Sequence, residues 1–213
     1  MSLLSYIFPR IILKTSSSYN REIRVLEESG KYKLLVNGSR QSGSYIAMLW
    51  RRAFLNFSIA HLPVSRILVL GVGGGTVFGL LKRFFPQAAM TGVDIDPTIL
   101  DIAEKYFGLA DMQGLTLIHD DAQGFVHKTR EHYDLVIVDL FFGREIPEFV
   151  TKDIFLTDLK RLTSPGGRIV INFLRELEYQ DKSDTFMQLL SKKFARVADF
   201  PIEKNRFFFI SHK

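Results

Sequence analysis

The pattern of apolar and polar positions changes partway along the chain. In the first part, residues 21–27 and 31–36 alternate polar and apolar side chains on either side of a Ser-Gly turn. Alternation with a period of two predicts a half-buried β-hairpin. Residues 45–61 then carry apolar side chains at helical spacing, which predicts a helix that ends before Pro63.

From residue 66 onward, short apolar runs alternate with helical patterns. Strands are predicted at residues 67–70, 90–93, 115–118, 135–138 and 169–171. Helices are predicted at residues 77–85, 97–107, 121–130, 151–162 and 181–193. Runs that are apolar throughout are typical of parallel strands buried on both faces. Two apolar runs around residues 203–205 predict a closing hairpin, with its last strand at 207–210.

The predicted fold class is therefore α/β: a doubly wound, mostly parallel sheet with an antiparallel C-terminal edge strand, preceded by a short N-terminal β-hairpin. The predicted division is an N-terminal segment and hairpin over residues 1–44 and an α/β domain over residues 45–213. With 46% apolar and 24% charged residues, the chain has enough apolar side chains for a core and is not a disordered segment.

Cysteine is absent from all 213 residues, which excludes disulfides, thiolate metal sites and a cysteine nucleophile, and we expect a cytoplasmic protein. The net charge of +5 comes from residues 1–65, without the basic-aromatic repeats of a nucleic-acid platform. The apolar segment 3–13 is interrupted by Pro9 and Arg10 and is too short to span a bilayer. We expect it to be a docking segment, and we expect neither nucleic acid nor membrane as a partner.

Ligands of doubly wound sheets bind beyond the carboxyl ends of the strands. The first predicted strand ends in the loop Gly71-Val-Gly-Gly-Gly-Thr76, where glycines let a ligand approach the backbone and the next helix offers free N–H groups. Asp94 follows the second strand and is placed to accept hydrogen bonds from ribose hydroxyls. Asp96 is predicted mainly as a helix cap. Asp121 follows the third strand either as a helix cap or as an acceptor for an adenine amino group.

The fourth strand of the parallel array ends at Asp139, a lone carboxylate after an apolar run. Such a use of a charge is unusual in a buried strand, so Asp139 is a candidate to accept a proton from a nucleophile or to orient an amine. The alternative is a cap for the following turn. Phe141 and Phe142 come directly after it and are expected to line an apolar acceptor pocket. Trp50 and the other phenylalanines are expected in the core.

Together these strand ends resemble those of the class I S-adenosylmethionine-dependent transferases, which have a Rossmann-like fold. Within that class the chain is most similar to the spermidine synthase (polyamine aminopropyltransferase) family, over about residues 19–175. The resemblance implies that the adenosyl ligand is bound by Gln41, Gly71, Gly73, Gly74, Gly75, Asp94, Ile95, Asp121 and Ala122. It also implies a catalytic Asp139, a substrate-contacting Tyr45 and a turn at residues 164–167 before the fifth strand. S-adenosylmethionine or its decarboxylated form is the implied co-substrate, with no metal, and a homodimer is expected.

The chain also departs from the family pattern. The family's glycine loop carries an aspartate that holds the aminopropyl amine, and here that position is Gly74. A second carboxylate after the catalytic strand is replaced by Phe142. The His or Gln and the Glu that follow the family tyrosine are Ile46 and Ala47, and the front domain is shorter. The nucleoside half of the family site is kept, whereas the polyamine half is largely lost.

The main hypothesis is a transferase that moves an aminopropyl or methyl group to an amine. The alternatives are a class I methyltransferase with an unknown small-molecule acceptor and a non-catalytic nucleoside-binding protein. A nicotinamide-dependent oxidoreductase is disfavoured because Thr76 stands where its fingerprint has a third glycine or alanine. A nucleic-acid methyltransferase is disfavoured because Asp139-Leu-Phe-Phe142 lacks prolines. The five histidines show no paired metal-ligand spacing.

Overall fold

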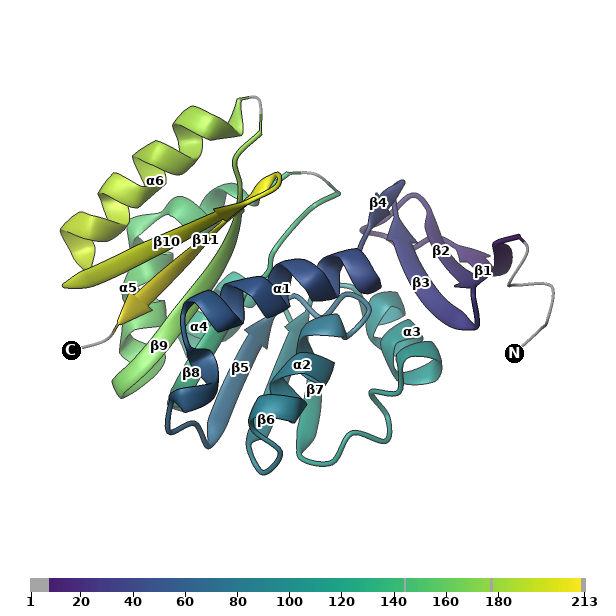
Figure 1. Ribbon diagram of the computed structural model, residues 1–213, viewed down its shortest axis with the longest axis horizontal. Coiled ribbons are helices and arrows are strands. Elements are labelled where there is room, and N and C mark those ends of the chain that lie inside the picture. The colour runs from purple at the N-terminus through teal and green to yellow at the C-terminus, as the bar shows by residue number, and fades with distance from the viewer. Residues whose placement is uncertain (1–7, 144, 177, 212–213) are drawn as a thin grey trace.

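The computed structural model describes residues 8–143, 145–176 and 178–211. Its strands form two separate sheets (Figure 1). The smaller sheet is antiparallel and has the order β1-β2-β3-β4. Its strands are β1 (Arg10–Thr15), β2 (Ile23–Glu28), β3 (Lys31–Val36) and β4 (Ser39–Arg40).

The predicted hairpin is confirmed as β2 and β3, and the structure extends it on both sides. Strand β1 pairs with β2 and the two-residue strand β4 pairs with β3. Residues 10–13 of the expected docking segment therefore belong to a strand, and residues 3–7 lie outside the described residues. The sequence pattern did not predict β1, because this strand is recognised only by its pairing with β2.

The larger sheet has seven strands in the order β10-β11-β9-β8-β5-β6-β7. They are β5 (Arg66–Leu70), β6 (Ala89–Asp94), β7 (Leu115–His119), β8 (Tyr133–Val138), β9 (Thr163–Leu174), β10 (Arg196–Ile202) and β11 (Asn205–Ser211). Strands β5 to β9 are parallel to one another, and β11 and β10 close the sheet in antiparallel pairing, as predicted. The chain runs from β5 to β6 and β7 and then returns to β8 on the other side of β5, which is the switch point of a doubly wound sheet.

The turn expected at residues 164–167 lies instead inside β9. Tyr133 pairs with Thr163 and Leu135 pairs with Arg168, so β9 has additional residues opposite β8 and its register shifts there. Gly166 has a φ of 80°, which a glycine adopts without strain. The Pro-Gly-Gly signal thus marks a bulge rather than a chain reversal.

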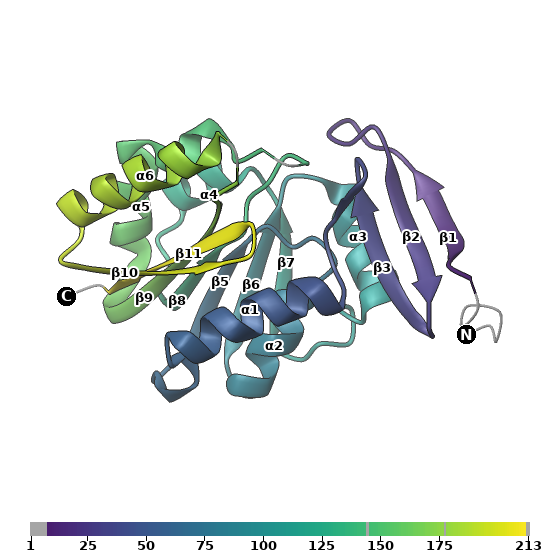
Figure 2. The same cartoon turned by 45° about the horizontal axis from the view of Figure 1, so that its top comes forward.

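Helices cover both faces of the large sheet (Figure 2). They are α1 (Ser44–Asn56), η2 (Ile59–His61), α2 (Thr76–Phe84), α3 (Pro97–Phe107), α4 (Ala122–Lys128), η3 (Glu148–Thr151), α5 (Asp153–Leu162) and α6 (Tyr179–Lys193). The helix predicted over residues 45–61 is divided in two because Ser58 has a left-handed φ of 52°. Among the described residues, no helix is long and apolar enough to cross a bilayer.

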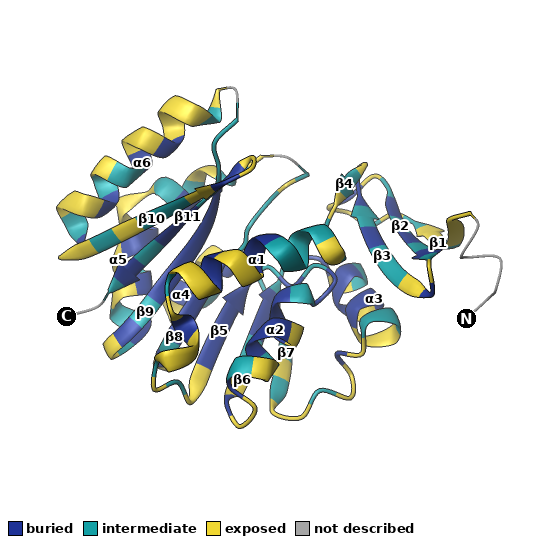
Figure 3. Ribbon diagram, viewed as in Figure 1, coloured by how far each residue is buried: buried dark blue, intermediate teal, exposed yellow. Residues whose placement is uncertain are grey.

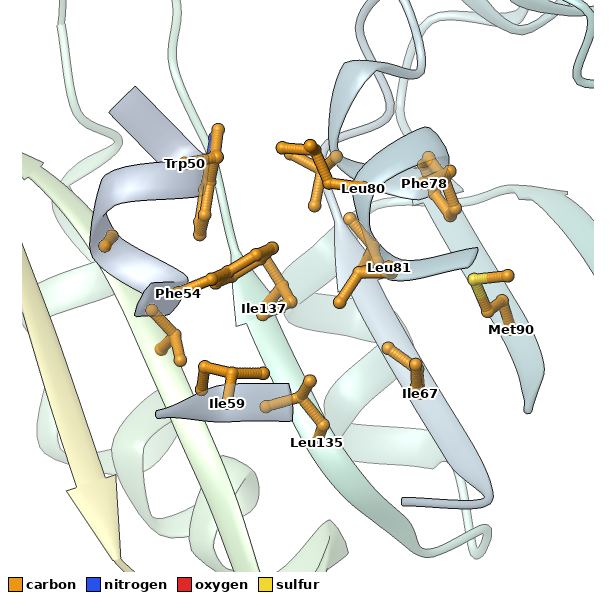
Figure 4. Packing of buried hydrophobic residues seen from close by; sticks show 14 of the residues in the cluster. Trp50, Phe54, Ile59, Ile67, Phe78, Leu80, Leu81, Met90, Leu135 and Ile137 are labelled. Carbon is orange, nitrogen blue, oxygen red and sulfur yellow. The ribbon is translucent and has the colours of Figure 1, made fainter. Parts of the chain in front are cut away.

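The central strands of the large sheet, such as β5 and β8, are buried on both faces, which is why they lack polar alternation (Figure 3). Alternate strand residues such as Ile67 and Val69 pack against α1 and α2, whereas Leu68 and Leu70 pack against α4, α5 and α6. Figure 4 shows Trp50 of α1 among these side chains. Its ring centroid lies 5.3 Å from that of Phe54. The single tryptophan is therefore in the core, as predicted.

Helix α3 joins the two sheets. Its Leu100 and Ala103 face the large sheet, while Ile99 and Ile102 pack against the small sheet. Asp96 caps this helix by accepting a hydrogen bond from the Thr98 N–H at 3.0 Å, which confirms the predicted cap. The small sheet is thereby held next to the carboxyl ends of the parallel strands. The proposed boundary between residues 44 and 45 stays a prediction.

Candidate active site

The glycine loop lies directly against the end of β8. Gly71 has a φ of 92°, and its N–H donates to the Val93 carbonyl at 2.9 Å. A Cβ at Gly71 would lie 2.2 Å from the carbonyl oxygen of Asp139. This close approach is possible only for glycine, and it brings the Asp139 residue to the edge of the loop.

The other glycines of the loop have different surroundings. Gly75 is the N-cap of α2 with a φ of 69°, and a Cβ there would meet Leu109. A Cβ on Gly74 would lie 2.4 Å from the Cβ of Ser42, which is 1% exposed. Gly74 and Gly75 are therefore buried behind the loop, and only Gly71 and Gly73 of the four predicted glycines line the open space in front of it.

That open space, called here the first cleft, has about 940 Å³ of empty volume including its mouth. It lies beyond the carboxyl ends of the strands around the switch point. The predicted site residues that line it are Gln41, Gly71, Gly73, Asp94, Ile95, Asp121, Ala122, Asp139, Phe141 and Phe142. Strand ends that are distant in sequence thus meet in one place, because parallel strands end at the same edge.

Asp94 holds the glycine loop as well as lining the first cleft. Its Oδ2 accepts from the Val72 N–H at 2.9 Å and the Gly73 N–H at 3.4 Å, and its Oδ1 accepts from the Asp96 N–H at 3.1 Å. Burial raises the pKa of Asp94, while these three backbone hydrogen bonds oppose the rise. The carboxylate therefore sets the shape of the loop to which a ligand would bind.

Asp121 is a helix cap, and its contact with adenine stays a prediction. Its Oδ2 accepts from the Gly124 N–H at 2.8 Å and caps α4. The residue also lines the first cleft. A carboxylate has about four lone-pair positions, so a cap does not prevent a further hydrogen bond to a ligand.

The charge of the first cleft is one-sided. Four carboxylates line it, those of Asp94, Asp96, Asp121 and Asp139. Within the described part of the chain, no Lys or Arg is among its lining residues. A cleft lined by one sign of charge attracts ligands of the opposite sign, which here means cations.

Asp139 lies where the first cleft meets another. Its Oδ1 accepts from the Asn172 side-chain N–H at 2.8 Å, and its Oδ2 accepts from the Trp50 indole N–H at 3.2 Å. Burial raises the pKa of Asp139 to about 6, against the lowering effect of these two hydrogen bonds. A carboxyl group with this pKa is mostly ionised at neutral pH and accepts a proton more readily than an ordinary aspartate.

The second cleft has about 1440 Å³ of empty volume including its mouth. Tyr45 lines it, and Phe141 lines both clefts, whereas Phe142 lines the first cleft and is 48% exposed. Burial is the largest cause of the raised pKa of Tyr45, followed by the negative charge of Glu203. The wall also contains Arg40 and an ion pair between Lys204 and Glu176 at 2.7 Å.

Three residues at this junction were not predicted as functional. Asn172 and Asn205 line the second cleft together with Trp50. Asn172 had a sequence signal, because it is the one polar side chain in the run Ile-Val-Ile-Asn-Phe-Leu that ends β9. Trp50 had none, because a tryptophan on the apolar face of a helix has the pattern of a core residue.

Comparison with known proteins gives the chain a family. The model of the spermine/spermidine synthase domain matches residues 56–202. The chain belongs to the spermine/spermidine synthase family. The predicted family is confirmed, and the matched region contains the glycine loop and the strands of the large sheet from β5 to β10, but not β11.

Members and neighbours of the family carry out more than one transfer. The chain is 32% identical over 132 residues to a polyamine aminopropyltransferase of Vibrio vulnificus, covering 60% of this chain and 44% of that protein. It is 31% identical over 149 residues to an eEF1A lysine and N-terminal methyltransferase homologue of Drosophila pseudoobscura pseudoobscura, covering 65% of this chain and 22% of that protein. The chain thus spans less than half the length of these two relatives.

The solved structures confirm the fold. A spermidine synthase in complex with the transition-state analogue AdoDATO superimposes with a TM-score of 0.80 at 15% identity, covering 96% of this chain and 74% of that one. The match includes nearly the whole described chain, so the small N-terminal sheet and the Rossmann-like domain both have counterparts there.

Proposed function

We propose that this family member transfers an alkyl group from an adenosyl sulfonium co-substrate to the nitrogen of an amine. The observation that carries the proposal is Asp139, a carboxylate with a raised pKa at the junction of two clefts. The first cleft would hold the nucleoside and the second the acceptor. Membership of the spermine/spermidine synthase family supports the same activity.

The proposed nucleoside site uses the residues named from the sequence. Asp94 and Ile95 would contact the ribose, Asp121 and Ala122 the adenine, and Gln41 the tail of the co-substrate. Gly71 and Gly73 would let the ligand approach the loop backbone, while Gly74 and Gly75 shape the loop from behind. The carboxylates of the first cleft support a cationic ligand, and a sulfonium is one.

The proposed reaction is a displacement at carbon. Asp139 takes a proton from the ammonium of the acceptor, which leaves a neutral amine with a free electron pair. That pair forms the new N–C bond while the C–S bond breaks, and the bonding electrons go to sulfur as a neutral thioether. Because no anion leaves, the work of the protein is alignment, exclusion of water and proton removal.

The first candidate for the transferred group is aminopropyl, from decarboxylated S-adenosylmethionine. The family match and the 32% identical aminopropyltransferase support it. This co-substrate has an ammonium in place of a zwitterionic tail, which suits the negative charge of the first cleft.

The second candidate is methyl transfer from S-adenosylmethionine, which the contact between Ser42 and Gly74 favours. At Gly74, the position of the family's amine-binding aspartate, a side chain would meet Ser42 at 2.4 Å. The Ser42 hydroxyl is held there by the Leu34 N–H at 2.8 Å. The site therefore lacks both that carboxylate and the room for it, and a methyltransferase homologue is among the relatives.

We propose a small-molecule amine as acceptor, contacted by Tyr45, Phe141 and Phe142. Tyr45 and Phe141 line the second cleft, and the two phenylalanines follow the carboxylate at its rim. A cytoplasmic location and a homodimer complete the proposal. The lack of cysteine supports the first, and the exposed Phe8 and Ile11 beside and on the outer strand β1 support the second.

Calorimetric titration with the two donors, followed by mass spectrometry of amine mixtures incubated with protein and donor, tests the proposal. We expect one donor to bind in preference and the product mass to show which group was added. Failure of both donors to bind would contradict the nucleoside site. Binding without transfer to any diamine, polyamine or amino acid would favour the non-catalytic alternative.

A further inference from the structure

A chain of amide groups connects the C-terminal hairpin to Asp139. The Asn205 side-chain N–H donates to the Asn172 carbonyl Oδ1 at 2.8 Å, and the Asn172 side-chain N–H donates to Asp139 at 2.8 Å. Asn172 is 7% exposed and Asn205 is 9% exposed. The three residues come from the end of β8, from β9 and from β11.

The order of donors and acceptors gives this chain a direction. Because Asn205 donates to the carbonyl oxygen of Asn172, the amide group of Asn172 must turn its NH₂ toward Asp139. A flip of that amide would lose both hydrogen bonds. Pairing of Asn172 with Phe207, and of Leu174 with Asn205, holds the two strands in the register that sets this contact.

The donors favour one protonation state of Asp139. Both of its oxygens accept from N–H groups, Oδ1 from Asn172 and Oδ2 from Trp50, and neither donor carries a charge. Such hydrogen bonds stabilise the ionised carboxylate and oppose the burial that favours the neutral acid.

We propose that Asn172 is a positioning residue, oriented by Asn205, which keeps the Asp139 carboxylate ionised and directed toward the junction of the two clefts. Its effect on catalysis rests on the proposed alkyl transfer. Its effect on Asp139 does not, since it follows from the hydrogen bonds alone. Through Asn205, the hairpin of β10 and β11 thus helps to position the Asp139 carboxylate.

Other charged or titratable groups face the same two clefts as Asp139. In the first cleft these are Asp94, Asp96 and Asp121, and in the second they are Arg40, Tyr45, Glu176 and Lys204. They are common to the wild type and the variants below. A difference between the variants therefore reports the amide chain.

Trp50 provides a direct signal, because it is the single tryptophan of the 213 residues and its indole N–H donates to Asp139. Its fluorescence should change with the ionisation of Asp139. We expect a transition with a midpoint near pH 6 in the wild type. In Asp139→Asn this transition should be absent.

In Asn172→Leu we expect the midpoint to move upward by about 1–2 pH units, because a hydrogen bond to a charged group is lost. Asn205→Leu should shift it in the same direction by less, since the amide of Asn172 remains but is no longer oriented. The matched control is Asn56→Ala, an exposed asparagine on the same helix as Trp50, which should leave the midpoint unchanged. If Asn172→Leu does not fold, Asn205→Leu alone carries the test.

The following results decide whether the proposal holds. An unchanged midpoint in folded Asn172→Leu or Asn205→Leu would overturn the proposal, as would a wild-type transition that survives Asp139→Asn. Where turnover is found, the acid limb of its pH profile should move with the fluorescence midpoint while donor binding stays the same. If the fluorescence midpoint shifts in these variants but the protein shows no turnover, the proposed function is contradicted and the proposed role of Asn172 is supported.

Discussion

At the scale of single residues, the position of Asp139 depends on three contacts of different kinds. The bare backbone of Gly71 lets the end of β8 approach the glycine loop. The side chains of Trp50 and Asn172 then hold the two carboxylate oxygens. Each contact is local, but together they place a proton acceptor between the proposed donor and acceptor sites.

We expect Asp139→Asn to lower turnover by about 10²–10⁴-fold, because an amide cannot take the proton from the acceptor ammonium and so cannot free the electron pair that attacks. Donor binding should change little, since the ribose and adenine contacts are elsewhere in the first cleft. Steady-state kinetics and calorimetry measure the two quantities. Turnover like that of the wild type would remove Asp139 from the mechanism.

Gly71→Ala should destabilise the fold by at least about 1–3 kcal/mol, because its φ of 92° is strained for alanine and the new Cβ meets the Asp139 carbonyl at 2.2 Å. The matched control is Gly79→Ala, within α2, where nothing lies within 4 Å. That change should stabilise by about 0.5–1 kcal/mol. Urea denaturation followed by circular dichroism distinguishes them, and equal effects would contradict the close approach.

At the scale of elements, helix α3 connects the small sheet to the large one. One face of α3 packs on the large sheet and another face packs on the small sheet. Asp96, the N-cap of this helix, accepts hydrogen bonds from the Asn20 side chain at 2.7 Å and from the Ser17 hydroxyl. The side chain that caps α3 therefore also holds the segment that contains Ser17 and Asn20.

Asp96→Ala should therefore cost more than an ordinary cap, about 2–4 kcal/mol, because a buried Asn20 amide also loses its acceptor. Asp101→Ala, on an exposed face of the same helix, is the control and should stay within about 0.5 kcal/mol of the wild type. Equilibrium unfolding measures both. A loss of less than about 1 kcal/mol for Asp96→Ala would show that the small sheet does not depend on this anchor.

Most elements follow from local pattern alone. The parallel strands, the helices between them and the closing hairpin were predicted because the spacing of apolar residues within each segment indicates its secondary structure and its buried face. The details that the local pattern did not predict are those set by distant partners. Residues 164–167 form a bulge in β9 because β9 pairs with β8 on either side of them. Residues 10–13 form a strand because they pair with β2.

At the scale of the whole molecule, a bound nucleoside would contact the ends of strands from both sides of the switch point. We expect the preferred donor, at 100 times its Kd, to stabilise the fold by about 2.7 kcal/mol, which for a chain of this size raises the Tm by roughly 5–10 °C. Differential scanning fluorimetry measures this shift. Asp121→Ala should reduce it through weaker binding, and an equal shift in that variant at the same donor concentration would exclude Asp121 from the site.

The sequence by itself determined the large sheet and the edge at which its site lies. Gly71, Asp94, Asp121 and Asp139 follow strands whose apolar pattern is local, and the topology of parallel strands brings their ends together. Only the tertiary structure showed that Asn205 orients Asn172 toward Asp139, although the members of each pair are 33 positions apart in the sequence. Only it showed that Ser42 fills the space that a side chain at position 74 would need. In each of these contacts, neither side chain stands out from its own segment of the sequence. Contacts between residues that are far apart in the chain produce no periodic pattern, so the sequence alone does not predict them.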